Sequence, residues 1–391
     1  MYNLSQGEGV CIRVYYFKSI QDDYGYKGDT VMKIGVIGLG YWGPNLVRNF
    51  MATEGVDGVV GCDVLDTRLA KIKGAFHEVE VCRSFDDVLK RSDVDAIVLA
   101  TPVSTHFPLG MRALEAGKHL LVEKPLTSYT ADAEALLERA EQNHLVLMVD
   151  HTFLYTSAVR KIKELYDEGE IGEVLYFDSV RVNLGIFQRD TNVIWDLAPH
   201  DISIMDYIIG LKPLSVSAVG VNHFNGHEDI AYINVSFPNR VIAHFHLNWL
   251  SPVKIRRILI GGTKRMVVYD DMEPSEKLKL YDKGVQIKGK EWEYKALVEY
   301  RIGDMYAPRI EQTEALSLMV KDFVGAVLTG AQPVSSAQSG LNVVRILEAA
   351  EYSLRAEGQI VNLSGDGKRV STSTPALVRT FRSHPTEWLK K

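Results

Sequence analysis

The chain has 391 residues, of which 46% are hydrophobic and 24% are charged. This length is about two to three times that of a common domain, so two domains are expected rather than one core. The composition is that of a globular protein and excludes a disordered, collagen-like or disulfide-dense chain. The formal net charge of -6 argues against a nucleic-acid partner and against binding to an anionic membrane surface.

Cysteine content and hydropathy indicate a cellular compartment. Cys11, Cys62 and Cys82 are spaced neither as a metal motif nor as an even disulfide framework, which favours a reducing environment. No apolar run approaches the roughly 20 residues that a membrane-spanning helix needs, and the N-terminal segment lacks the apolar core of a signal peptide. A soluble, cytoplasmic protein is therefore expected.

An alternating pattern occupies the chain from residue 32 to about residue 150. Helix-like segments separate short runs rich in Val, Ile and Leu, which cover residues 33–38, 58–63, 95–100, 118–124 and 145–150. This alternation predicts an α/β domain with a doubly wound parallel sheet, in which both faces of each strand are covered. Residues 1–31 precede the pattern and are expected to be a non-essential extension.

The rhythm changes after Asp150. Helices are expected over residues 157–169 and 201–210, and the strands over residues 173–185, 214–222, 230–237, 241–250, 254–262 and 264–271. Strands that follow one another with few helical breaks predict a large, mainly antiparallel open sheet, so residues 151–360 are expected to form an α+β domain. Helical patterns at residues 314–330 and 341–358 would pack back on the first domain, and residues 361–391 are expected to be a tail.

Gly38, Gly40 and Gly43 form a G-x-G-x-x-G pattern between the first apolar run and a helix-like segment. In a dinucleotide site these glycines permit a tight turn, close approach of a pyrophosphate to the backbone, and close helix packing. Asp63 ends the next predicted strand, where a carboxylate accepts hydrogen bonds from the adenosine ribose. A plain glycine turn is the alternative, but the full context predicts a Rossmann nucleotide site.

The charge of Asp63 would repel a 2′-phosphate, which favours NAD over NADP. Arg68, five residues further on, either receives such a phosphate or is a surface arginine. Because ligands bind at the carboxyl ends of parallel strands, further cofactor contacts are expected from Tyr41, Trp42, Thr101, Pro102, His106, Glu123 and Lys124.

Lys124 follows a buried strand, which makes it either a partly desolvated proton handler or an exposed lysine at a strand end. Asp196 and His200 are four residues apart, so they share one helix face if a helix begins near Asp196, with Pro199 in its first turn. A carboxylate beside an imidazole would orient the ring and raise its affinity for a proton, as suits a general base. A helix-capping aspartate beside a structural histidine is the alternative.

Several other side chains are candidates for the substrate pocket. His151 and Tyr155 follow a strand end, and Trp195 precedes Asp196; each either borders the pocket or packs in the core. His244 and His246 alternate along one strand and point away from its apolar face. They belong either to a metal site or to a subunit contact, and no metal is expected because a third ligand with suitable spacing is missing.

The segments GVIGLGYWG, ATPVSTH, AGKHLLVEKP, MVDHTF and WDLAPHD together resemble the glucose-fructose oxidoreductase and inositol dehydrogenase (Gfo/Idh/MocA) family. The resemblance spans about residues 32–358. It implies a Rossmann domain plus an open-sheet domain, bound NAD(P), and hydride transfer at a carbinol of a sugar, nucleotide sugar or cyclitol. It assigns Lys124 as the catalytic lysine and Asp196 and His200 as the D-x-x-x-H pair. Many members carry a further Asp three residues after the His, where this chain has Ser203, which puts a role for that position in doubt.

The WDLAPHD and GYWGPNLVRNF segments look most like members encoded with surface-polysaccharide genes, some of which resemble UDP-N-acetylglucosaminuronate 3-dehydrogenases. Such a substrate carries a diphosphate and a carboxylate and would need cationic partners. Arg181 and Arg189 are the candidates, with solvated surface arginines as the alternative.

The sequence thus predicts an NAD-dependent oxidoreductase in which His200, held by Asp196, exchanges the hydroxyl proton while Lys124 orients the oxygen. The alternatives are an NAD-dependent glycosidase that uses transient oxidation and a non-catalytic NAD or sugar sensor. A small-molecule substrate and a homodimer or homotetramer assembled through the open sheet are expected.

Overall fold

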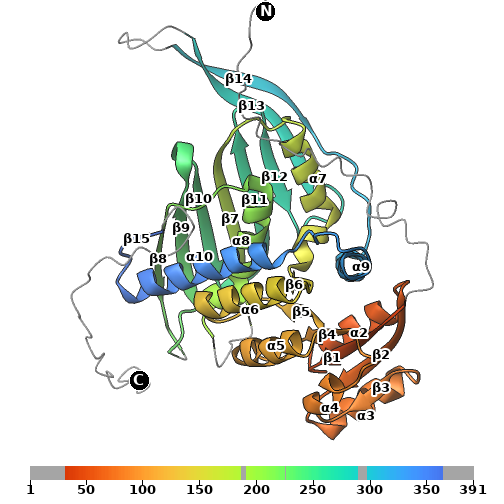
Figure 1. Cartoon of the computed structure of the whole chain (residues 1–391). Helices are drawn as coiled ribbons and strands as arrows, with labels where there is room; N and C mark the ends of the chain where they lie inside the picture. The colour runs from red at the N-terminus through yellow and green to blue at the C-terminus, as the bar shows by residue number, and fades with distance from the viewer. Residues whose placement is uncertain (1–30, 186–190, 225, 289–296, 364–391) are drawn as a thin grey trace, which may run out of the picture.

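The computed structural model describes residues 31–185, 191–224, 226–288 and 297–363. Two sheets dominate it, a six-stranded sheet in the N-terminal part and a nine-stranded sheet in the C-terminal part (Figure 1). The expected extension up to residue 30, the expected tail from residue 364 and Arg189 lie outside the described residues.

The first sheet is wholly parallel and has the strand order β3-β2-β1-β4-β5-β6. Its strands are β1 (Met32–Ile37), β2 (Val56–Cys62), β3 (Glu80–Cys82), β4 (Ala96–Leu99), β5 (His119–Glu123) and β6 (Leu147–Asp150). Every residue of β4 and β6 is buried, because helices cover both faces of such a sheet. The doubly wound parallel sheet predicted from the sequence is confirmed.

Crossover helices connect these strands: α2 (Gly43–Met51), α3 (Asp66–Ala75), α4 (Phe85–Leu89), α5 (His106–Glu115) and α6 (Thr130–Gln142), with a 3₁₀ turn η1 (Val103–Thr105) before α5. The order reverses between β1 and β4, so a crevice forms at the carboxyl ends of these two strands. The glycine segment and Lys124 both lie at this edge.

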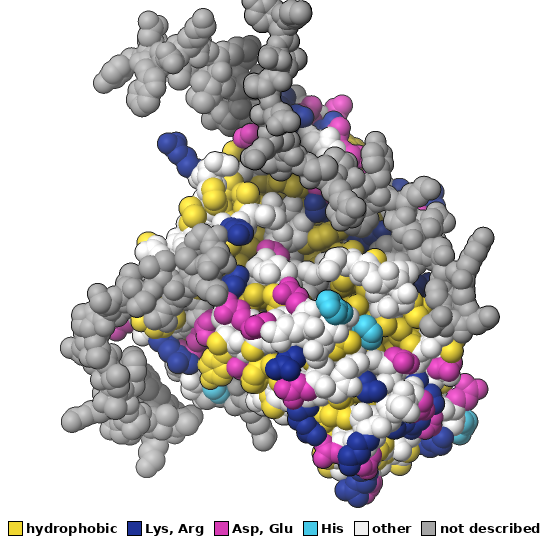
Figure 2. All heavy atoms as spheres, in the orientation of Figure 1, with side chains coloured by type: hydrophobic (Ala, Val, Ile, Leu, Met, Phe, Trp, Pro, Cys, Tyr) yellow, Lys and Arg dark blue, Asp and Glu magenta, His cyan; other side chains and the backbone are white. Residues whose placement is uncertain are grey.

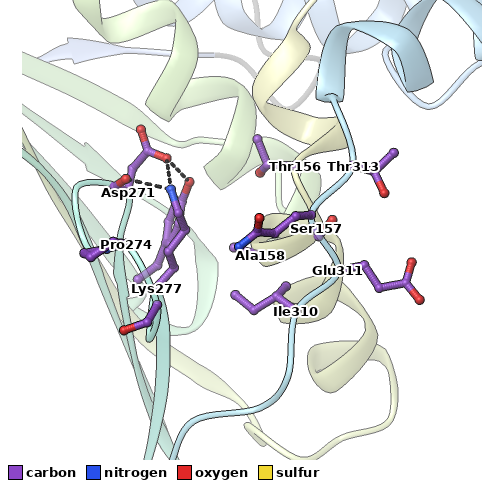
Figure 3. A pocket seen from close by; sticks show the side chains of 12 residues that line it. Thr156, Ser157, Ala158, Asp271, Pro274, Lys277, Ile310, Glu311 and Thr313 are labelled. Atoms are coloured by element: carbon purple, nitrogen blue, oxygen red, sulfur yellow. Dashed lines mark hydrogen bonds and ion pairs between the residues drawn. The ribbon is translucent and has the colours of Figure 1, made fainter.

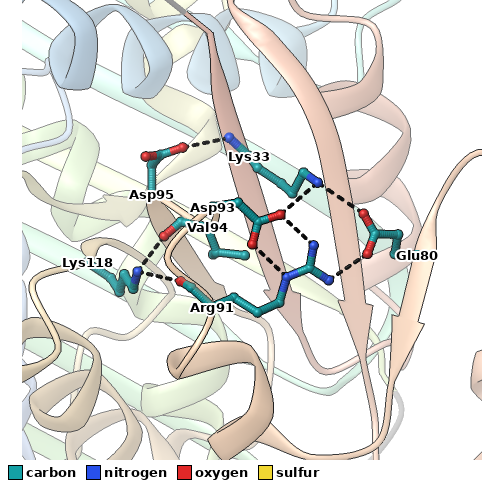
Figure 4. A network of polar contacts seen from close by, with 7 residues as sticks. All are labelled: Lys33, Glu80, Arg91, Asp93, Val94, Asp95 and Lys118. Atoms are coloured by element: carbon teal, nitrogen blue, oxygen red, sulfur yellow. Dashed lines mark hydrogen bonds and ion pairs between the residues drawn. The ribbon is translucent and has the colours of Figure 1, made fainter.

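Charged side chains close the opposite edge of the parallel sheet (Figure 4). Lys33 lies between Glu80 and Asp93 at 3.1 and 3.0 Å, and Arg91 pairs with the same two carboxylates. Lys118 donates from Nζ to the backbone carbonyls of residues 91 and 94 at 2.9 and 2.6 Å. This network joins the amino ends of four strands and leaves the carboxyl edge for ligands.

The second sheet has the order β14-β13-β12-β11-β7-β10-β9-β8-β15 and is antiparallel except where β10 pairs with β7. Its strands are β7 (Val174–Leu184), β8 (Ser215–Val221), β9 (Ile230–Ser236), β10 (Ile242–Asn248), β11 (Leu250–Gly262), β12 (Met266–Asp270), β13 (Leu278–Lys288), β14 (Leu297–Tyr306) and β15 (Val361–Asn362). The mainly antiparallel sheet predicted for this half is confirmed.

Helices pack against one face of the second sheet (Figure 1). They are α7 (Ser157–Asp167), α8 (Val193–Ile209) and α10 (Ala337–Arg355), with the 3₁₀ turn η2 (Thr152–Tyr155) before α7. A further 3₁₀ turn, η3 (Pro238–Arg240), joins β9 to β10. α9 (Ala315–Thr329) packs on α2, and α10 packs on α6. The C-terminal helices therefore bridge the two sheets.

Several elements differ from the sequence-based expectation. α8 begins at Val193, capped by the side chain of Asn192, which accepts hydrogen bonds from the amides of Ile194 and Trp195. Pro199 therefore lies inside the helix and not in its first turn. In addition, β13 and β14 were not anticipated, because charged residues interrupt their apolar pattern, and β3 and β15 were missed because they have only three and two residues. The expected tail from residue 361 is wrong at its start, because Val361 and Asn362 pair with β8.

Candidate functional site

The glycine segment at the end of β1 has the geometry that a pyrophosphate requires. Gly38 has φ of +94°, and a Cβ on it would lie 2.5 Å from the carbonyl oxygen of Ala100. A Cβ on Gly43 would lie 2.1 Å from the Gly38 carbonyl oxygen, whereas above Gly40 the first atoms belong to Arg68 at 3.9 Å. The first and third glycines are thus required by packing, and the second leaves room for a ligand above the backbone.

Asp63 lies just after β2 and is buried. Its Oδ2 accepts hydrogen bonds from the amide of Leu39 at 2.8 Å and from Arg68 at 3.1 Å, and its Oδ1 accepts one from the amide of Leu65 at 2.9 Å. These donors hold the pKa of Asp63 below its usual range despite burial, which opposes them. The carboxylate is therefore charged and fixed beside the glycine loop, and Arg68 is its partner.

Tyr41 and Trp42 stand between the second and third glycines. Tyr41 is 92% exposed and stacks on Trp42, with ring centroids 6.3 Å apart. Trp42 is the N-cap residue of α2, and no side chain caps that helix end. The Nε1 of Trp42 instead donates to Oδ2 of Asp150 at 3.1 Å, so the loop is tied to the end of β6.

Lys124 meets the start of α8. Its Nζ donates to the backbone carbonyl oxygen of Asp196 at 3.0 Å and lies 4.0 Å from the Oδ1 atom of Asp196. Both side chains line a pocket of about 580 Å³, together with Trp195 and with Glu351 and Arg355 of α10. The structure thus brings together the lysine and the aspartate that the sequence singled out.

The expected link between Asp196 and His200 is wrong in its detail. The Oδ2 of Asp196 accepts a hydrogen bond from Nε1 of Trp249 at 3.0 Å, and its other oxygen faces Lys124. The Nδ1 of His200 is buried, and no described residue forms a hydrogen bond with it. Asp196 therefore orients Lys124 and not the imidazole.

The proton affinity of His200 is lowered, whereas the sequence predicted that Asp196 would raise it. Burial, followed by the positive charges of Lys124 and Arg181, holds the pKa of His200 well below its usual value. The ring packs edge-on against Phe153, with centroids 4.9 Å apart. His200 is consequently a neutral imidazole at neutral pH, able to accept a proton but weakly basic.

Arg181 does not present its guanidinium to a ligand. The side chain is 5% exposed and pairs with Asp201 through two hydrogen bonds of 2.9 and 2.6 Å. The guanidinium lies over the ring of Phe153 at 4.7 Å. This arrangement contradicts a direct role of Arg181 in binding an anionic substrate. Arg181 instead holds Asp201, the residue that follows His200 in α8.

Two further candidates are scaffold residues. His106 is buried, and its ring nitrogens contact the backbone carbonyls of Pro125 and Thr101 at 3.0 and 2.9 Å. It therefore holds together the loops after β4 and β5, while Thr101 and the exposed Pro102 lie at the cleft. Tyr155 is fully buried and donates to Asp322 at 2.5 Å, so it does not border the pocket.

His151 is buried directly after β6, and neither ring nitrogen has a hydrogen-bond partner among the described residues. Burial and the nearby charge of Lys124 lower its pKa to about 3. His151 and His200 thus place two neutral imidazoles near the lysine. Buried polar atoms without partners are uncommon in proteins and mark a place where a polar ligand group or water is expected.

Sequence reasoning missed four residues of this site: Asp150, Phe153, Trp249 and Arg256. The guanidinium of Arg256 lies 5.8 Å from the ring of Phe153, and Arg256 is the register partner of Arg181 on the neighbouring strand. MVDHTF contained Asp150 and Phe153, and the aspartate at a strand end was a usable signal. Trp249 lies between β10 and β11, and Arg256 lies on β11. Both are far from Asp150 along the chain, and only the folded sheet brings them to this site.

A second pocket of about 370 Å³ lies at the start of α7 and contains none of the predicted site residues. Figure 3 shows Asp271 and Lys277 on one side of it and Ile310 and Glu311 opposite. Lys277 donates to the backbone carbonyl of Asp271 at 2.8 Å. The chemistry-bearing side chains gather around Lys124 and not around this pocket.

At the bottom of Figure 2, Lys and Arg side chains are interspersed with Asp and Glu side chains. The face of the N-terminal domain drawn there therefore has no patch of a single charge sign. Among the described residues, no group of three or more His, Cys, Asp and Glu is placed to hold a metal ion. None of the helices within the same ranges is long and apolar enough to cross a membrane.

Comparison with known proteins identifies both halves of the chain. Residues 32–151 match the model of the oxidoreductase family with an NAD-binding Rossmann fold, and residues 159–268 match the GFO/IDH/MocA C-terminal domain. A UDP-N-acetylglucosamine 3-dehydrogenase of Acidithiobacillus ferrooxidans is 30% identical over 257 residues, which are 65% of this chain and 78% of the relative. An NADP-dependent scyllo-inositol 2-dehydrogenase of Bacillus subtilis is 22% identical over 86% of this chain and 97% of its own.

The solved structure of the Acidithiobacillus ferrooxidans enzyme superposes with a TM-score of 0.70 at 26% identity and covers 83% of this chain and 98% of its own. The glycine segment and Lys124 both lie within the residues that match the NAD-binding family model. The chain belongs to the Gfo/Idh/MocA family of oxidoreductases.

Proposed function

We propose that this oxidoreductase transfers hydride between NAD and a secondary carbinol or ketone of a sugar, nucleotide sugar or cyclitol. The observation that carries the proposal is the position of Lys124. It follows β5 at the dinucleotide edge of the parallel sheet, and its Nζ lies 3.0 Å from the carbonyl of Asp196 in the other domain. A reacting carbinol at this junction would contact both the lysine and the cofactor cleft.

The residues at the cleft fit a dinucleotide. The space above Gly40 and the helix end of α2, which no side chain caps, suit a pyrophosphate. Asp63 is a charged carboxylate at the ribose position, which supports NAD as the preferred cofactor. When bound, the nicotinamide ring supplies the hydride donor or acceptor.

The side chains of the protein would manage the hydroxyl group and its proton. The Lys124 ammonium orients the carbinol oxygen, and Asp196, held by Trp249, keeps the lysine in place. His200 is neutral at neutral pH because its pKa is lowered by burial and by the charge of Lys124. It is therefore the candidate acceptor of the hydroxyl proton, which it passes on to solvent.

The named relatives support this substrate class, since one is a nucleotide-sugar dehydrogenase and another acts on an inositol. A nucleotide sugar would need a cation for its phosphates, and Arg181 is not free to provide one. Arg355 lines the same pocket as Lys124, and its side chain is 77% exposed despite its pair with Glu351. Arg355 is therefore the better candidate for a phosphate contact.

A substrate panel tests this proposal. The full-length protein with NAD or NADP is mixed with UDP-N-acetylglucosamine, UDP-N-acetylglucosaminuronate, free sugars and inositols, and reduced cofactor is followed by absorbance. We expect turnover of at least one compound, faster with NAD. Release of a free sugar from a glycoside without net reduced cofactor would instead identify the glycosidase chemistry. Tight NAD binding with no turnover of any compound would favour a sensor.

We also propose that the protein assembles as a homodimer or homotetramer through the face of the nine-stranded sheet opposite α8. Tyr232, Ile242 and Val219 on that face are 38%, 46% and 51% exposed. Tyr232 stacks on His246 at 4.7 Å and His244 at 6.1 Å, and His244 is bonded to Asn234. Apolar and aromatic groups on an uncovered sheet suit a subunit contact.

A cytoplasmic location is proposed too, because Cys62 and Cys82, register partners on β2 and β3, are free thiols.

A further inference from the structure

Asp150 lies where three functional segments meet. It ends β6 and is 2% exposed. Its Oδ2 accepts the hydrogen bond from Nε1 of Trp42 in the glycine loop, and its Oδ1 accepts one from the hydroxyl of Thr152 in η2. Glu123, the residue before Lys124, is its register partner on β5. One buried carboxylate thus contacts the glycine loop, the start of η2 and the residue beside the catalytic lysine.

Glu123 lies beside Asp150 at the ends of two neighbouring strands. The two residues are register partners on β5 and β6, and Oε1 of Glu123 is buried without a hydrogen-bond partner among the described residues. Burial, followed by the adjacent charge of Asp150, raises the pKa of Glu123 well above its usual value. Glu123 is therefore a neutral carboxyl beside Asp150 at neutral pH.

We propose that Asp150 is a positioning residue that fixes the glycine loop relative to Lys124 through its hydrogen bond with Trp42 and its register pairing with Glu123 on the neighbouring strand. Trp42 is the N-cap of α2, where the pyrophosphate would bind, and Glu123 is covalently joined to Lys124. A displacement of one segment against the other changes the distance between the nicotinamide and the reacting carbinol. This inference rests on the proposed dehydrogenase function, because only hydride transfer makes that distance matter.

The chain offers a matched comparison in Asp322. This aspartate is also 2% exposed, and it accepts hydrogen bonds from the hydroxyl of Tyr155 and from the amide of Val334 at 2.5 and 2.8 Å. Through these bonds it joins the same η2 turn to the segment before α10. Replacement of either aspartate by asparagine changes a buried carboxyl group into an amide, and Asp150 is the one that bonds the glycine loop through Trp42.

The kinetic experiment uses Asp150→Asn and Asp322→Asn in the full-length protein. With the fastest compound of the substrate panel, Asp150→Asn should lower kcat by about 10- to 100-fold, while the Kd for NAD changes by less than about threefold. Asp322→Asn should lower the melting temperature at least as much and leave kcat within about twofold of the wild type. Equal losses of kcat in both variants, in step with their stability, would show that Asp150 has only a structural role.

An infrared measurement on the protein without substrate tests the protonation of Glu123 separately. The carbonyl stretch of a protonated carboxyl should be present in the wild type at pH 7 and absent in Glu123→Gln. It should persist in Asp150→Asn, because burial, the largest cause of the raised pKa of Glu123, remains. A band that Glu123→Gln leaves unchanged would contradict a neutral Glu123 beside Asp150 and overturn the proposed arrangement. If no panel compound is turned over while the band behaves as expected, the dehydrogenase assignment fails and the neutral Glu123 stands.

Discussion

The Nζ atom of Lys124 donates a hydrogen bond to the backbone carbonyl oxygen of Asp196 at 3.0 Å. This contact joins the end of β5 in the nucleotide domain to α8, which packs on the open sheet. Pro199 lacks an amide hydrogen, which leaves the carbonyl of Trp195, in the same turn as Asp196, without its usual helical donor. The start of α8 therefore presents polar backbone groups to the lysine, and the proposed active site depends on both domains.

Replacement of Lys124 by methionine should stop hydride transfer without preventing cofactor binding. Methionine keeps the length and removes the charge, so kcat should fall by about 100-fold or more, while the Kd for NAD stays within a few-fold of the wild type. Lys118→Met is the matched control at the other end of the same strand. It breaks the hydrogen bonds to residues 91 and 94, so it should lower the melting temperature and leave kcat nearly unchanged. Normal turnover in Lys124→Met would remove the lysine from the mechanism.

Cofactor preference should depend on the pair formed by Asp63 and Arg68. In Asp63→Ser the negative charge is lost, and Arg68, whose guanidinium is 3.1 Å from the carboxylate, becomes available for a 2′-phosphate. The ratio of the Kd values for NAD and NADP, measured by calorimetry, should shift toward NADP by about tenfold or more. The double variant Asp63→Ser with Arg68→Ala should lose most of that gain. An unchanged ratio in Asp63→Ser would contradict the ribose position assigned to Asp63.

The open sheet should carry the subunit contact. Light scattering after size exclusion should give a dimer or tetramer for the wild type, and Tyr232→Glu should shift it toward the monomer, because a charge would be buried in the interface. Val81→Glu, which changes an exposed apolar residue on β3 of the first domain, should leave the mass unchanged. A wild-type monomer, or an unaffected Tyr232→Glu oligomer, would exclude this face.

Asp206 should make stability depend on pH. It accepts hydrogen bonds from Ser339 and Asn342, but burial raises its pKa to about 6, against 3.8 for the unperturbed group. Between these values the folded chain binds more protons than the unfolded chain, so stability declines as the pH rises through this window. Asp206→Asn should therefore stabilise the protein by about 1 kcal/mol or more at pH 8 and have little effect near pH 4.

Chemical denaturation at the two pH values measures this difference. Asp304→Asn, an exposed aspartate on β14, serves as the control and should change stability equally little at both. The same gain for Asp206→Asn at pH 4 and pH 8 would show that the carboxyl is not destabilised by ionisation.

The sequence was sufficient for the features that depend on local pattern. The apolar runs of β1, β2, β4, β5 and β6 and the spacing of Gly38, Gly40 and Gly43 predicted the parallel sheet and its glycine turn. The helix α8 begins earlier than the sequence predicted because Asn192 caps its N-terminus. A lone asparagine before an apolar stretch was not recognised as a helix-capping signal.

Side-chain partners were the part that the sequence could not supply. Arg181 was expected in the pocket, yet Asp201, 20 residues away, binds it in the core. Asp196 was expected to hold His200, yet Trp249 and Lys124 are its partners because β10 and β5 bring them to the same end of α8. Such pairs are set by the packing of distant elements, which no local spacing encodes.

Transfer of a deuterium label tests whether hydride passes between the substrate and the nicotinamide. The carbinol hydrogen of the turned-over sugar, nucleotide sugar or inositol is replaced by deuterium, and the cofactor is examined by mass spectrometry after a single turnover. We expect the deuterium on the nicotinamide ring in the wild type and no labelled cofactor with Lys124→Met. A label that is lost to solvent or stays on the product, with cofactor unlabelled, would contradict hydride transfer at this site.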